Sequence, residues 1–147
     1  RAAEPRTAAG GQETAVSDAT PGLGRRLASM VYEAVLLFAV GFFAAWLFYF
    51  ASGAQDATAG AMRRVLQGFI GVVFAGYFLW SWLRGGQTLA MKAWRIRLVE
   101  VTPPRALLRF ALATVLVPTL VSILWTFFDR DRQFLHDRLA GTRLVNA

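Results

Sequence analysis

The side chains that could do chemistry in this sequence are ionisable groups at the edges of long apolar runs. Glu33 follows Arg26 by about two helical turns, which puts its carboxyl group roughly 10 Å further along a helix and inside an apolar run. A charge at that depth is costly unless it is paired or protonated, so it marks a candidate functional site. Two interpretations of Glu33 stay open: a paired site residue, or an interfacial carboxylate that lipid headgroups solvate.

A paired Glu33 needs a basic partner on the same side of the membrane. The arginines expected on that side are Arg84, Arg97 and Arg109. We therefore predict that Glu33 contacts one of these three guanidinium groups rather than open lipid.

His136 and Asp137 form a second group of ionisable residues. His136 is the only histidine and the chain has no cysteine, which excludes a multi-histidine metal site, disulfides and thiol chemistry. A single histidine beside an aspartate is typical of a surface hydrogen-bonding residue rather than of a catalyst. The sequence also has no Gly-rich phosphate loop and no Gly-x-Ser-x-Gly motif. We therefore expect no enzyme activity, no catalytic residue, no metal site and no cofactor.

Three uncharged apolar blocks must position these residues: Ala34–Ala51, Val65–Leu83 and Phe110–Phe128. Each is roughly 18–19 residues long, which as a helix matches a hydrocarbon core about 30 Å thick. None of them has the polar stripe that a helix of a soluble bundle needs. The first two blocks therefore predict full spans of an integral membrane protein.

The basic residues lie at the ends of the apolar blocks. Sixteen Lys and Arg against nine Asp and Glu give a net charge of +7, and this distribution favours anionic lipid headgroups over nucleic acid as the partner. The connection from Trp82 to Arg105 is strongly basic, so we expect it and the N-terminus on the cytoplasmic side. Arg63 and Arg64, in the loop expected outside, break this rule.

The third block, Phe110–Phe128, has two interpretations. As a single span it would carry the C-terminal tail, with four arginines, to the outside. Pro118 lies in its middle, where a proline removes a backbone hydrogen bond and clashes with the preceding turn. A Pro-broken or re-entrant segment would return the tail to the cytoplasm, and we favour this interpretation.

Two short β-prone stretches support the second interpretation. Arg95–Val99 and Thr142–Val145 both contain Arg-Leu-Val, and they can pair only if they lie on the same side. We therefore predict that the tail and the Trp82–Arg105 connection share the cytoplasmic face. The expected fold is an all-α membrane protein, a small helical bundle with two full spans, a third broken or re-entrant segment, and a short interfacial strand pair.

Residues 1–24 contain few large apolar side chains and cannot bury enough surface to offset the entropy of ordering them. We expect a disordered N-terminal tail over 1–24 and a membrane domain over 25–147. The chain begins with Arg rather than Met, so we expect its natural start to lie further upstream.

Three motifs carry polar groups that a simple membrane anchor does not need. Together, from about Gly24 to Val145, they resemble the RDD family of small bacterial multi-pass membrane proteins. In one departure, the first Asp of the family pattern is Glu33 here, which keeps the charge but lengthens the side chain. The matching residues are Arg25, Arg26 and Glu33 in the first motif, Gly86, Gln87, Thr88, Leu89, Lys92, Arg95 and Arg97 in the second, and His136, Asp137, Ala140, Gly141 and Thr142 in the third.

The resemblance implies the bacterial cytoplasmic (inner) membrane and a role in transport, with cation–proton exchange proposed for some members. With so few helices, ion- or proton-linked transport would need a homo-oligomer or other membrane subunits. The alternative is a non-catalytic accessory or assembly subunit of a larger membrane complex. In either case the candidate polar network consists of Arg25, Arg26, Glu33, Gln87, Thr88, Lys92, Arg95, Arg97, Arg109, His136, Asp137 and Thr142.

Overall fold

The computed structural model of the chain describes residues 20–54 and 56–147. Of the tail predicted to be disordered, residues 1–19 lie outside this described part. The folded part begins earlier than predicted, because helix α1 (Leu23–Ala51) starts at Leu23 and Pro21 is fully buried. Leu23 packs against the apolar core, and this burial offsets the entropy of ordering the helix start.

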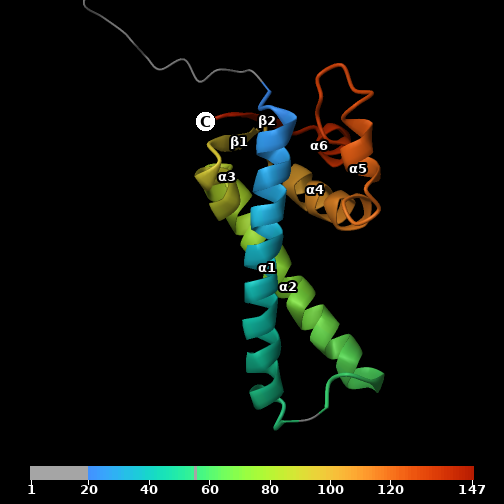
Figure 1. Cartoon of the computed structure of the whole chain (residues 1–147). Coiled ribbons are helices and arrows are strands. Elements are labelled where there is room, and N and C mark those ends of the chain that lie inside the picture. The colour runs from blue at the N-terminus through green and yellow to red at the C-terminus, as the bar shows by residue number, and fades with distance from the viewer. Residues whose placement is uncertain (1–19, 55) are drawn as a thin grey trace, which may run out of the picture.

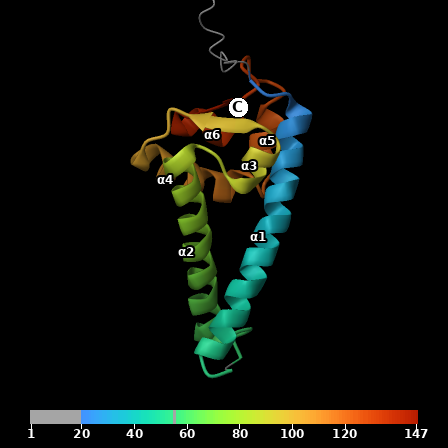
Figure 2. The same ribbon diagram turned by 90° about the vertical axis from the view of Figure 1, so that its left-hand side faces the viewer.

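Two long helices, α1 and α2 (Gly60–Gly85), form the body of the molecule (Figures 1 and 2). They contain the first two apolar blocks and extend beyond them, since the flanking arginines are good helix formers. The helices meet closely at Gly41, where a Cβ atom would lie 3.2 Å from the ring of Phe74. Only 6% of each apolar stretch is buried, so these are not core helices of a soluble domain. Both are long and apolar enough to cross a membrane.

The remaining elements gather at one end of the helix pair, opposite the loop that joins α1 to α2 (Figures 1 and 2). We call them the end layer. They are α3 (Leu89–Ala93), β1 (Ile96–Val99), α4 (Pro103–Leu116), α5 (Val121–Trp125), α6 (Leu135–Ala140) and β2 (Arg143–Asn146).

The third apolar block is broken, and the interpretation of Phe110–Phe128 as one continuous spanning helix is wrong. Helix α4 ends at Leu116, just before Pro118, which has no N–H to continue it. The hydroxyl of Thr119 donates to the carbonyl of Leu116 at 2.9 Å, which satisfies one of the carbonyls freed at the helix end. Leu120 then takes a left-handed conformation (φ 60°), and the chain turns into the short helix α5.

The predicted strand pair is confirmed. β1 and β2 are antiparallel, with Leu98 opposite Leu144. The pair therefore places the C-terminal tail and the connection after α2 at the same end of the molecule. Gly86 joins α2 to this layer with φ 67°, and a Cβ atom there would lie 2.5 Å from the carbonyl oxygen of Leu98.

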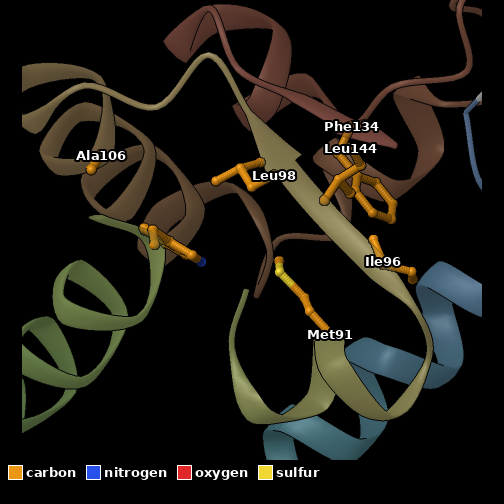
Figure 3. Close-up of a cluster of buried hydrophobic side chains, with 7 residues drawn as sticks. Met91, Ile96, Leu98, Ala106, Phe134 and Leu144 are labelled. Atoms are coloured by element: carbon orange, nitrogen blue, oxygen red, sulfur yellow. The ribbon is translucent and has the colours of Figure 1, made fainter. Parts of the chain in front are cut away.

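A small apolar core ties the end layer to the top of α2. Figure 3 shows side chains from α3, β1, α4 and β2 meeting around the strand pair. The buried members of this core are Trp82, Met91, Ile96, Leu98, Ala106, Phe134 and Leu144.

Candidate functional site

A cavity of about 490 Å³ lies beneath the end layer, between α1, α2 and α4. Most of its wall is apolar, with Leu37, Phe74 and Val117 among the lining residues. Its ionisable lining residues are Arg26, Glu33, Arg109 and His136, all four from the predicted polar network. A mostly apolar pocket of this size with a few convergent polar groups is the usual form of a ligand site.

Glu33 is not paired with Arg84, Arg97, Arg109 or any other arginine that the structure describes, so that prediction is wrong. In the described part of the chain its Oε2 atom accepts a hydrogen bond from the hydroxyl of Thr88, and its Oε1 atom is buried without a partner. The phenol of Tyr77 on α2 lies beside the same carboxylate. Thr88 also accepts from the backbone N–H of Met91 at 3.2 Å, so one hydroxyl caps α3 and links it to α1.

The three arginines proposed as partners of Glu33 have other positions. Arg84 is exposed and stacks on Trp80 at 4.4 Å, and Arg97 is exposed on β1. Arg109 on α4 pairs instead with Asp137 on α6, with 2.5 Å between Nε and Oδ1.

The Arg109–Asp137 pair is buried, with side-chain exposures of 5% and 0%. The guanidinium of Arg109 also lies over the ring of Trp82 at 4.3 Å, which adds a cation–π contact. The second carboxylate oxygen of Asp137 has no hydrogen-bond partner among the described residues. This pair therefore holds α4 against α6 and leaves one acceptor free.

His136 is buried, not at the surface as predicted, because α6 packs against α5. Its Nδ1 lies 2.6 Å from the hydroxyl oxygen of Ser122, which also accepts from the backbone N–H of His136 at 3.3 Å. The hydroxyl proton is then free to point at Nδ1, so we assign the ring proton to Nε2. Burial lowers the pKa of His136 to about 4, which keeps the ring neutral at pH 7.

Arg26 is the most unusual member of the site. Its side chain is 1% exposed, and its guanidinium lies over the ring of Phe134 at 4.8 Å. None of its three side-chain nitrogen atoms has a hydrogen-bond partner in the part of the chain that the structure describes. Asp137 and Asp129 are near enough to act on its charge, but neither hydrogen-bonds to it. Buried donors without an acceptor are costly, so this group is a candidate for contact with something outside the chain.

The other members of the predicted network lie outside the cavity. Gln87 donates to the carbonyl of Ile96 at 2.7 Å, and the backbone N–H of Thr142 donates to the carbonyl of Asp137 at 3.0 Å. These bonds hold the end layer together. Arg25 donates to the side chain of Asn146 at 3.1 Å, and Lys92, Arg95 and Arg97 are exposed.

Sequence reasoning missed several polar residues of the end layer. Gln133 is buried and bonds to Thr20 and to the backbone of Leu144. Asp129 is also buried, and its carboxylate accepts from Arg138. The sequence did contain a signal for these residues, because the alternating charges from Asp129 onward are unusual after an apolar block. In the described residues no group of three or more His, Asp or Glu side chains could hold a metal ion.

The model of the RDD family matches residues 20–141 of the chain. The match begins just before α1 and ends at the C-cap of α6, so it includes the whole cavity wall except Leu144. No curated protein and no solved structure matches the chain.

Proposed function

Because this chain belongs to the RDD family and has two exposed apolar helices of spanning length, we propose that it is an integral membrane protein that carries out proton-linked transport of a charged solute as an oligomer. One observation carries the proposal. The guanidinium of Arg26 is buried without a hydrogen-bond partner in the described part, the Glu33 carboxylate is held by the hydroxyl groups of Thr88 and Tyr77 rather than by an arginine, and both residues line one cavity. Ionisable groups held in this way at membrane depth are typical of substrate and proton pathways.

The charges around the cavity support separate roles for these two residues. Arg109 and Asp137 neutralise each other, and His136 is neutral. Arg26 and Glu33 remain, about two helical turns or roughly 10 Å apart on α1. We assign the binding of an anionic group to Arg26 and the uptake and release of a proton to Glu33.

The proposed membrane is the bacterial inner membrane, with the end layer and the N-terminus in the cytoplasm. Arg25 at the start of α1 is exposed, as are Lys92, Arg95 and Arg97 in the end layer beside it. Basic residues in short segments next to spanning helices favour the cytoplasmic side.

The oligomer follows from the number of helices. The described part has two helices that are long and apolar enough to span, and two helices cannot enclose a polar path. Their exposed aromatic faces, including Phe38, Phe42 and Trp46 on α1, leave room for a second copy.

The proposal is tested by proton flux into liposomes. The purified protein is reconstituted with phosphatidylcholine and phosphatidylglycerol around a pH-sensitive dye, and valinomycin imposes a potassium diffusion potential. We expect acidification faster than in protein-free liposomes, and we expect Glu33→Gln to remove this increase because an amide cannot carry the proton. The matched control is Glu100→Gln, which changes an exposed carboxylate outside the cavity.

Two results would refute the proposal. The first is wild-type flux equal to that of protein-free liposomes, and the second is full flux in Glu33→Gln. If flux is absent while mass analysis of a mild detergent extract finds a partner at fixed stoichiometry, the accessory or assembly role is favoured instead.

A further inference from the structure

The cavity has a charged end and an apolar end, and this asymmetry identifies a class of ligand. We propose that it binds an anionic phospholipid, with the phosphate on Arg26 and one acyl chain along the apolar wall. The inference rests on the proposed function in taking this cavity as the transport site, and it makes the phospholipid the solute.

The charged end is the guanidinium of Arg26. Arg26 is 1% exposed and lines the cavity, and its side-chain nitrogen atoms have no hydrogen-bond partner among the described residues. A guanidinium presents a planar fork of N–H donors that matches the oxygens of a phosphate, often in a bidentate arrangement. A phosphate would therefore satisfy donors that the protein itself leaves unsatisfied.

The surroundings of Arg26 favour a headgroup with a net negative charge. Arg25 and Arg132 are exposed near the same end of α1, in the layer above the cavity. The two carboxylates that act on Arg26, Asp137 and Asp129, are each paired with another arginine, Arg109 and Arg138 respectively. A zwitterionic headgroup would place an ammonium beside these arginines, which is unfavourable.

The rest of the wall selects an acyl chain over water or a free anion. Leu37, Phe74, Ala113 and Val117 line the cavity beyond the polar groups. This part of the space of about 490 Å³ offers few groups that could hold ordered water, which needs two to four polar partners. Inorganic phosphate would satisfy Arg26 and leave this apolar space unfilled.

The order of the two ends agrees with the direction of a lipid in a bilayer. Arg26 lies near the start of α1, at the level of the end layer, whereas Leu37 lies about 16 Å further along the helix. A headgroup at Arg26 would sit at the interface, and its chain would run alongside α1 and α2 toward the membrane interior.

The test is native mass spectrometry of the full protein in mild detergent with added lipid. We expect retention of phosphatidylglycerol over phosphatidylcholine, and we expect Arg26→Gln to weaken retention roughly 10- to 100-fold, the value of a charge-assisted phosphate contact. The matched control, Arg130→Gln, removes an exposed arginine of the end layer and should retain lipid as the wild type does.

A second pair of variants keeps the test decisive if Arg26→Gln does not fold. A Cβ atom at Gly71 or at Gly68 meets nothing within 4 Å, and only Gly71 lines the cavity. Both substitutions to leucine should fold, because leucine is the better helix former. Gly71→Leu should occupy the chain site and reduce lipid retention, while Gly68→Leu should not.

Several outcomes would overturn the inference. They are equal retention of the two lipids, retention unchanged in Arg26→Gln and Gly71→Leu, and displacement of the lipid by millimolar inorganic phosphate, which would identify a free anion as the ligand. Binding is measured without flux, so the two proposals fail separately. Proton flux without lipid selectivity would contradict the proposal of a phospholipid ligand, and lipid selectivity without proton flux would contradict the proposal of transport.

Discussion

Loss of the Asp137 carboxylate should destabilise the protein more than any surface substitution, because it leaves the buried guanidinium of Arg109 without its counter-ion. In the native structure Arg109 Nε lies 2.5 Å from Asp137 Oδ1, and both side chains are at most 5% exposed. In Asp137→Ala the guanidinium of Arg109 loses its counter-ion and, among the described residues, keeps its contact with the ring of Trp82. Removing one partner of a buried ion pair typically costs about 3–5 kcal/mol.

The assay for Asp137→Ala is unfolding in detergent, followed by circular dichroism, with Asp131→Ala as the control. Asp131 is exposed, so its loss should change the free energy of unfolding by less than about 0.5 kcal/mol. The double variant Arg109→Met, Asp137→Leu should recover most of the lost stability, since a well-packed apolar pair often replaces a buried ion pair at little cost. A loss below about 1 kcal/mol in Asp137→Ala would refute the reasoning, because it would mean that water reaches the guanidinium.

Three further predictions concern single contacts. The unfolded protein binds a proton at His136 near pH 6.5, whereas the folded protein binds it only near pH 4. The free energy of unfolding should therefore fall by up to about 3 kcal/mol as the pH drops through this window. Denaturant titrations of His136→Gln should lack this pH-dependent loss of stability. Gly86→Ala should lower the melting temperature, with a cost of about 1–3 kcal/mol in stability, because the residue has φ 67° and the new methyl group would meet the carbonyl of Leu98. A melting temperature equal to that of the wild type would contradict this close approach. Thr88→Val should cost about 1–3 kcal/mol by leaving the Oε2 atom of Glu33 without its donor, whereas Thr88→Ser should melt near the wild-type temperature.

Features that depend on local chemistry were predictable from the sequence. Pro118 ends α4 for a reason that belongs to the proline itself, and the break lies where it was expected. The β propensity of the two Arg-Leu-Val stretches predicted the strand pair. Both long apolar helices were evident from the length of their apolar blocks.

Features that depend on tertiary contacts were not predictable. A carboxylate inside an apolar helix requires a partner, but nothing local distinguishes the hydroxyl of Thr88 from a guanidinium as that partner. His136 looked like a surface residue because its burial depends on how α5 and α6 pack after the turn at Pro118. The lack of a partner for Arg26 is likewise visible only when every neighbour has been placed.

The central claim is that the Glu33 carboxylate carries the transported proton, and Glu33→Asp tests it most directly beside Glu33→Gln. The shorter acid keeps the ionisable group and is the residue of the family pattern, whereas the amide keeps the size and loses the proton. In liposomes under the same potassium diffusion potential, we predict proton flux in Glu33→Asp and none above the protein-free level in Glu33→Gln. Equal flux in the two variants, whether high or low, would contradict the claim, because it would show that the proton does not pass through this carboxylate.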